Sequence, residues 1–123
     1  MSRDMIRLMQ ALFLPGVQPC TEAGWCPAAD IYRTPAGWLV KLELAGVRPE
    51  DMRVTADRSV LSVTGCRRDC TLSEGCCQYQ MEIAYSYFER SLELPCNLDN
   101  CGITTSYHDG MLHIHITETE AQR

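Results

Sequence analysis

Apolar and polar residues alternate over most of the chain, and this period of two predicts β-strands. The clearest run is 38–44, where one face of a strand would carry Trp38, Val40, Leu42 and Leu44. Similar runs occupy 30–33, 52–56, 60–64, 79–94, 103–107 and 111–116. Turn-forming residues separate them, including an Asp109-Gly110 pair that is typical of a two-residue hairpin. Seven short strands with frequent turns predict an all-β, antiparallel β-sandwich.

The N-terminal residues follow a different period. Apolar side chains recur there at helical spacing, at Met5, Leu8, Met9, Leu12 and Phe13. A helix this short is marginal in water unless it docks on another surface. We therefore expect a short amphipathic helical arm within residues 1–24, a sandwich domain over 25–116 and a short tail over 117–123.

The composition narrows the class of protein. A length of 123 residues corresponds to one domain, and the net charge of −5 argues against a nucleic-acid partner. Asp4, Arg7 and Gln10 interrupt the N-terminal apolar run, so neither a signal peptide nor a membrane span is expected. The sequence predicts a cytoplasmic protein.

The sequence contains no recognisable catalytic motif. There is no G-x-S-x-G segment, no phosphate-binding loop and no G-x-G-x-x-G segment. His113 and His115 share one face of a predicted strand and could share a metal ion, but such a pair is more often simply the polar face of the strand. We expect no enzymatic activity, no cofactor and no metal site.

Cysteine is unusually frequent, with eight residues at positions 20, 26, 66, 70, 76, 77, 96 and 101. Without a signal peptide, reduced thiols are expected. The simplest interpretation is that they are small core, edge or incidental residues. A redox switch is an alternative, because Arg67 and Arg68 could lower the thiol pKa values of Cys66, Cys70, Cys76 and Cys77. Zinc is less favoured, since Cys66 and Cys70 have suitable spacing but Cys76 and Cys77 are adjacent.

Five segments resemble, in order, the α-crystallin domain of bacterial small heat-shock proteins. Residues 25–32 resemble its opening, and 43–51 resemble its E-L-P-G-V-x-P-E-D segment with Ala45 in place of the usual proline. Residues 60–65 resemble V-L-x-I-x-G, 85–95 resemble Y-G-x-F-x-R-x-F-x-L-P, and 109–114 resemble D-G-V-L-x-V.

This resemblance implies an immunoglobulin-like sandwich and an ATP-independent holdase, which binds partially unfolded client proteins and suppresses their aggregation. Flexible apolar residues suit irregular clients, and the five arm residues named above would supply them. Two alternatives remain open. One is a p23-like co-chaperone or adaptor that binds one defined partner, and the other is a cysteine-based redox-sensing binding protein.

The resemblance also implies self-association into a homodimer or small oligomer. In relatives, the loop corresponding to 66–78 carries an extra strand that pairs with a neighbouring subunit, and Arg90, Cys70 and Leu72 would lie at that interface. A groove would accept an Ile-x-Ile motif from another subunit, and its lining would be Val54, Ala56, Cys101, Ile103 and Thr105. The chain's own Ile-x-Ile, at 114–116, is expected to belong to the last strand, and residues 117–123 offer no apolar anchor.

Overall fold

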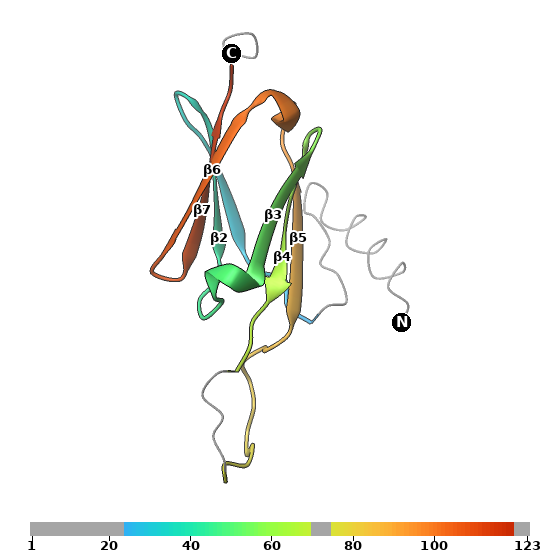
Figure 1. The fold of residues 1–123 in the computed structure, drawn as a ribbon, viewed down its shortest axis with the longest axis vertical. Helices are drawn as coiled ribbons and strands as arrows, with labels where there is room; N and C mark the ends of the chain where they lie inside the picture. The colour runs from blue at the N-terminus through green and yellow to red at the C-terminus, as the bar shows by residue number, and fades with distance from the viewer. Residues whose placement is uncertain (1–23, 70–74, 120–123) are drawn as a thin grey trace.

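Seven β-strands form two antiparallel sheets that face each other (Figure 1). The computed structural model describes residues 24–69 and 75–119, so the predicted N-terminal helix lies outside the described residues. The strands are β1 (Ala29–Arg33), β2 (Gly37–Glu43), β3 (Met52–Asp57), β4 (Val60–Cys66), β5 (Tyr87–Glu93), β6 (Gly102–His108) and β7 (Met111–Thr117). The predicted antiparallel sandwich is confirmed.

One sheet has the order β1-β2-β7-β6 and the other the order β3-β4-β5. The chain changes sheets twice, and each passage contains a short 3-10 turn: η1 (Pro49–Asp51) after β2 and η2 (Leu98–Asn100) after β5. Each sheet ends in two strands with only one neighbour. The four edge strands are therefore β1, β6, β3 and β5.

Alternation along the strands builds the core between the sheets. Residues predicted to share a face are buried together, including Val40 and Leu42 of β2 and Ile114 and Ile116 of β7. The chain's Ile-x-Ile therefore lies inside the sandwich, as predicted, with both isoleucines at 0–1% exposure. Burying aliphatic side chains of this size contributes roughly 1.5–3 kcal/mol each before conformational entropy is subtracted.

The hairpin between β6 and β7 turns at Asp109 and Gly110. Their φ angles are +53° and +75°, as a two-residue hairpin turn of the primed type requires. The strands pair in direct continuation of this turn, from His108 opposite Met111. The turn predicted from the Asp-Gly pair is confirmed.

The predicted strand over 79–94 is wrong in its first half, because β5 begins only at Tyr87. The reason lies in the neighbouring strand: β4 ends at Cys66, which pairs with Tyr87, so the residues before Tyr87 have no ladder partner among the described residues. Cys66 is a strand residue rather than the first residue of the loop. The connection, drawn as a long extension below the sandwich in Figure 1, therefore begins at residue 67 and reaches residue 86.

Close packing at the base of this connection depends on a glycine. A Cβ atom on Gly65 would collide with the backbone oxygen of Asp51 and with the ring of Phe88. The ring of Trp25 packs edge-on against Phe88 with 5.3 Å between centroids, and Trp25 forms a parallel bridge with Phe88 along the backbone. The absence of a side chain at Gly65 thus lets the aromatic pair close this end of the sandwich.

A buried carboxylate closes the opposite end of the four-stranded sheet. Glu118 directly follows β7, is 5% exposed, and accepts hydrogen bonds from Trp38 Nε1 at 2.7 Å and Arg33 Nη1 at 3.2 Å. It thereby links the first two strands of the sheet to the end of β7. Glu118 lies within the predicted tail, and no sequence motif marks it as a structural residue.

Replacing Gly65 by alanine should destabilise the domain by about 1–3 kcal/mol, the usual cost of forcing extra volume into a packed site. Urea unfolding followed by tryptophan fluorescence measures this loss. Gly102→Ala is the matched control, because its added Cβ would meet only Thr117 at 3.8 Å, an ordinary contact. Equal stability of the two variants would contradict this account of Gly65.

Candidate interaction surfaces

A groove lies between the edge strands β3 and β6, one from each sheet. It has a volume of about 610 Å³, and its lining includes Val54 of β3 and Ile103 and Thr105 of β6. These are three of the five predicted groove residues. The other two, Ala56 and Cys101, do not line this volume and instead pack half-buried against the core.

At the end of the groove lined by Tyr107, a hydrogen bond joins β6 to the loop that follows β2. Tyr107 lines the groove, and its hydroxyl donates to the carbonyl oxygen of Leu44 at 2.7 Å. Met52 and Pro49 complete this end. The groove therefore combines apolar side chains with exposed polar atoms, and this mixed lining suits an extended segment of another chain that carries apolar side chains and backbone polar groups.

Arg90 lies in the middle of β5, with its side chain on the core side. It pairs with Val63, which is fully buried, and its guanidinium reaches the segment before β1. Nη1 donates to the carbonyl oxygen of Pro27 at 3.1 Å, and it lies 3.8 Å from Cys26 Sγ. Arg90 thus connects the two sheets within one chain. Its predicted place at a dimer interface stays a prediction, and Cys70 and Leu72 lie outside the described residues.

Arg67 organises the base of the long connection. Its guanidinium lies 3.7 Å from the ring centroid of Trp25, and it donates to the carbonyl oxygens of Ala84 at 2.8 Å and Ala45 at 3.2 Å. The backbone of Arg67 also donates to Ser86. One side chain therefore joins both ends of the connection to the sandwich, and sequence reasoning missed it because its partners are distant in the chain.

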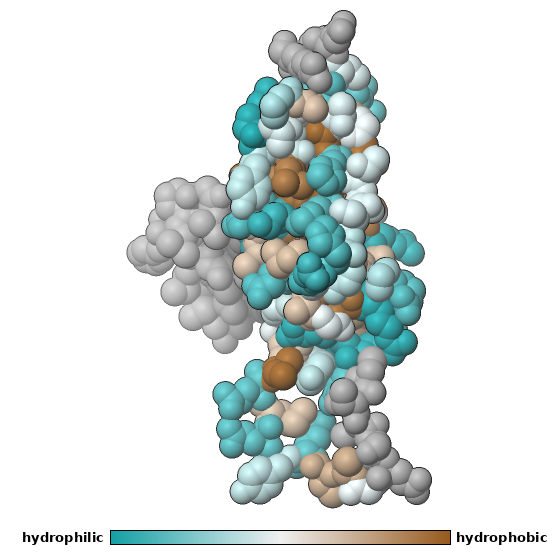
Figure 2. Space-filling view, turned by 90° about the vertical axis from the view of Figure 1, so that its left-hand side faces the viewer, coloured by the Kyte–Doolittle hydropathy of each residue, from teal (hydrophilic) through white to brown (hydrophobic). Residues whose placement is uncertain are grey.

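The segment that leads into β5 exposes a row of large apolar side chains. They occur at every second residue, at Tyr79, Met81, Ile83, Tyr85 and Tyr87. Their exposed fractions range from 39% at Tyr85 to 100% at Tyr79. Figure 2 shows brown and tan residues set among teal ones where this extension projects below the sandwich. Alternation of this kind is the pattern of a strand with one apolar face, yet residues 79–86 are not paired as a strand with any described residue.

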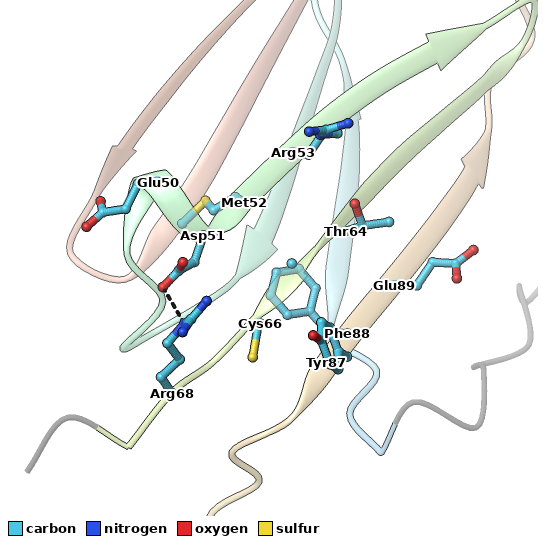
Figure 3. A pocket seen from close by; sticks show the side chains of 11 residues that line it. Glu50, Asp51, Met52, Arg53, Thr64, Cys66, Arg68, Tyr87, Phe88 and Glu89 are labelled. Carbon is cyan, nitrogen blue, oxygen red and sulfur yellow. Dashed lines mark ion pairs between the residues drawn. The ribbon is translucent and has the colours of Figure 1, made fainter.

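A second recess, of about 450 Å³, lies beside the end of β4 (Figure 3). Cys66 and Tyr87 line one side, and an ion pair of 3.2 Å between Arg68 and Asp51 lines the other. The two arginines next to Cys66 thus contact other groups: Arg67 the ring of Trp25 and two carbonyls, Arg68 the Asp51 carboxylate. The predicted redox role of the loop cysteines stays a prediction.

The described cysteines differ in state. Cys26 takes part in a disulfide bond, so the expectation of reduced thiols is wrong at this position. Thiols are present at Cys66, Cys76, Cys77, Cys96 and Cys101. Cys76 and Cys77 are exposed, whereas the other three are half-buried. In residues 24–69 and 75–119, no three His, Cys, Asp or Glu side chains are arranged to hold a metal ion.

The histidines gather on the outer face of the four-stranded sheet. The rings of His108 and His113 have centroids 4.8 Å apart, and those of His113 and His115 are 6.3 Å apart. Desolvation lowers the pKa of His113, and the nearby charges of His108, Lys41 and His115 lower it further. His113 therefore takes up a proton less readily than an ordinary histidine does.

Comparison with known proteins assigns this chain to a family. Residues 30–123 match the sequence profile of the Hsp20/alpha crystallin family. Small heat shock protein C2 of Rickettsia felis is 29% identical over 81% of this chain and 65% of its own length, and 18 kDa antigen 2 of Mycobacterium avium is 32% identical over 74% and 64%. The chain thus spans somewhat less than two thirds of the length of these relatives.

Solved structures agree with this assignment. A small heat-shock protein from Xylella fastidiosa is 32% identical, covers 82% of this chain and 93% of its own, and superposes with a TM-score of 0.67. The hspA protein from Xanthomonas axonopodis is 29% identical over 78% of this chain and 96% of its own, with a TM-score of 0.64.

The chain therefore belongs to the Hsp20/alpha crystallin family, the small heat-shock proteins, and it is of the bacterial type. None of its described residues forms a helix with the length and apolar character that a bilayer crossing requires.

The lowered pKa of His113 gives stability a pH dependence with a definite sign. Between that lowered value and the ordinary value of 6.5, the unfolded chain binds more protons at this residue than the folded chain does. Stability should therefore fall as the pH drops below 6.5 and should not respond to this group above it. Thermal midpoints recorded across this window should decline less steeply for His113→Gln than for the wild type. Parallel profiles would show that His113 does not contribute.

Proposed function

We propose that this protein is an ATP-independent holdase, which binds partially unfolded client proteins and prevents their aggregation. The observation that supports this most directly is the exposed apolar row at residues 79–87, together with the open apolar groove between β3 and β6. Large exposed apolar side chains in a folded protein mark sites for other polypeptides. The five apolar residues of the N-terminal arm are proposed as further client surface.

Binding of this kind needs no chemical step. An unfolded client offers apolar side chains and unpaired backbone groups, and an apolar row on an extended segment matches both. Met81 adds a flexible, polarizable side chain that adapts to irregular partners. The free energy of holding therefore comes from burying apolar area, which is available without ATP hydrolysis.

The holdase proposal predicts that equimolar protein suppresses the light scattering of a heat-aggregating client, with the same effect in the presence and absence of ATP. Deleting residues 1–24 should weaken suppression while the far-ultraviolet circular dichroism of the sandwich is retained. Failure to suppress scattering even at several-fold excess would contradict the holdase and favour an adaptor that binds a single partner.

We further propose that residues 79–86 pair as a strand with β1 of a second copy. The segment has the alternation of a strand, and it is not paired as a strand with any residue that the structure describes. Of the four edge strands, β3 and β6 flank the groove, and β5 carries the backbone bridge from Trp25. The edge of β1 remains, with Ile31 and Tyr32 each more than 40% exposed.

Such an exchange is reciprocal. If each copy donates its segment to β1 of the other, the two contacts are identical and close around a two-fold axis. The contact would bury alternate apolar residues of the segment and satisfy backbone groups on the β1 edge. A dimer would then be the building unit.

Replacing Ile83 by aspartate should weaken this dimer. Each copy loses the burial of one isoleucine, worth about 1.5–3 kcal/mol, so the dissociation constant should rise at least about tenfold. Sedimentation velocity over a dilution series measures the change. Gln80→Asp serves as the matched control, since Gln80 lies outside the apolar row and should alter dimerisation little. Equal dissociation constants for both variants would exclude the exchange through this face.

The groove between β3 and β6 is proposed to receive an Ile-x-Ile segment from another chain. Ile114 and Ile116 of this chain are buried in β7, so the segment must come from elsewhere. The half-buried side chains of Val54 and Ile103 provide apolar walls on opposite sheets, and Tyr107 with Met52 lines the closed end.

A fluorescent peptide that contains Ile-x-Ile should bind the wild type, and Ile103→Asp should reduce its affinity by about tenfold or more, because the charge would be left in an apolar wall. Thr104→Asp is the control, since Thr104 is the next residue of β6 and points to the opposite face of the sheet. Fluorescence anisotropy reports both. Equal loss with the two variants would place the peptide outside the groove.

A further inference from the structure

Two cysteines outside the predicted redox set flank a single short turn. Cys96 precedes η2 and Cys101 follows it, at the passage from β5 to β6. The turn is closed by the amide of Cys101, which donates to the carbonyl oxygen of Leu98 at 3.1 Å, so the two cysteines stand on either side of one tight turn. The Cys101 thiol donates to the carbonyl oxygen of Asn97, the residue next to Cys96, at 3.4 Å. Cys101 is also close enough to Cys96 to contribute to the raised pKa of the Cys96 thiol.

The turn that presents the two thiols is firmly held. Leu98 is buried, and its amide donates to the carbonyl oxygen of Arg58 at 2.6 Å. The Asp99 carboxylate accepts from the Arg58 amide at 3.2 Å, and the Asn97 side chain accepts from the Asp99 amide at 3.0 Å. These contacts fix η2 against the β3–β4 turn, so little conformational freedom is lost when the sulfur atoms approach.

A small oxidant has access to the pair. Cys96 lines an open recess of about 350 Å³, and Arg58, Glu93 and Asn97 line it too. Both cysteines are half-buried and pack against the core, so they lie at the surface end of the sandwich interior.

The environment of Cys96 disfavours its thiolate. Burial raises the pKa of Cys96 to about 11, and the proximity of Cys101 and of the Glu118 carboxylate contributes in the same direction. Dithiols whose thiolate is stabilised make oxidising disulfides that are easily reduced, and Cys96 is the opposite case. The Cys96 thiol is therefore protonated at neutral pH, and the dithiol gains no stability from ionisation that would oppose closure to a disulfide.

We propose that Cys96 and Cys101 form a redox-sensitive dithiol that closes to an intramolecular disulfide with a low-molecular-weight disulfide, such as glutathione disulfide, as oxidant. The Cys101 thiolate attacks one sulfur of glutathione disulfide, forms a mixed disulfide and releases one glutathione thiolate. Cys96 then loses its proton to solvent and attacks the Cys101 sulfur, and the second glutathione leaves as its thiolate. The two cysteines are oxidised by two electrons, and glutathione disulfide is reduced to two glutathione molecules.

The bond would join the end of one sheet to the start of the other. Cys96 follows β5 of the three-stranded sheet, and Cys101 precedes β6, which forms one wall of the groove. Oxidation would therefore restrict the passage between the sheets next to the groove. Because the closed loop is short, the gain in stability is modest rather than large.

A peptide map isolates this pair from the other cysteines. Trypsin cleaves after Arg90, and the resulting peptide 91–123 contains Cys96 and Cys101 and no other cysteine. Full-length protein is equilibrated with glutathione disulfide, its remaining thiols are alkylated, and the digest is analysed by mass spectrometry without reduction. The expected peptide carries no alkyl group and is lighter than the dithiol peptide by two hydrogen atoms. Reduction before alkylation should restore both labels.

A second readout is stability. Oxidation should raise the thermal midpoint of the wild type by about 5 °C or more, an increase that Cys101→Ser should lack under the same oxidant. The matched control Cys76→Ser should retain it. The peptide map uses the wild type alone, so a poorly folding Cys101→Ser leaves that test intact.

Two results would overturn the proposal. One is peptide 91–123 with both cysteines alkylated under conditions in which Cys76 and Cys77 have lost their label. The other is peptide 91–123 joined through its cysteines to a different peptide, which would mean that the two thiols react with outside partners rather than with each other.

Discussion

A strand at the edge of a sheet presents unpaired backbone donors and acceptors, and this constraint governs the rest of the molecule. Two open sheets leave four such edges. The chain brings β3 and β6 to the two sides of one groove and places the Trp25 segment along β5. The remaining edge is that of β1, and residues 79–86 of a second copy are proposed to pair with it. Edges that are liabilities in an isolated chain are thus the surfaces proposed for association.

The long connection shows how a few contacts can direct an extended segment. Arg67 attaches both of its ends to the sandwich through Trp25 and the carbonyl oxygens of Ala84 and Ala45. Gly65 allows Phe88 and Trp25 to close the same region. The connection is consequently anchored at its base, while its apolar row remains exposed. Chaperone function in this family does not require an arranged catalytic centre, and the informative features here are exposure and edge geometry.

The two ends of the sandwich are closed by different chemistry. Aromatic packing closes the end from which the long connection projects, and the buried Glu118 carboxylate joins Arg33 and Trp38 at the other. A buried charge is tolerated only where it is paired, and here two donors share one carboxylate oxygen. The negative charge of Glu118 also contributes to the raised pKa of Cys96, because it opposes ionisation of the thiol. The passage between the sheets at η2 is therefore held by the buried Leu98 and its hydrogen bond to Arg58, and the charge of Glu118 acts on Cys96 beside it.

Local pattern was sufficient for much of the fold. Alternation identified the seven strands and the inward faces of β2 and β7, and the Asp109-Gly110 pair identified its hairpin, because side-chain period and turn conformation are properties of neighbouring residues. Five ordered motifs pointed to the family. Pattern alone could not place the start of β5 at Tyr87, since that boundary is set by where β4 stops, at Cys66. Nor could it find the roles of Arg67 and Glu118 or the proximity of Cys96 to Cys101. It also could not show which predicted residues line the groove, where Val54 and Ile103 do and Ala56 and Cys101 do not. Each of these depends on which segments the folded chain brings together, and a one-dimensional pattern contains the tendency of a residue to be buried or exposed but not the identity of its distant partner.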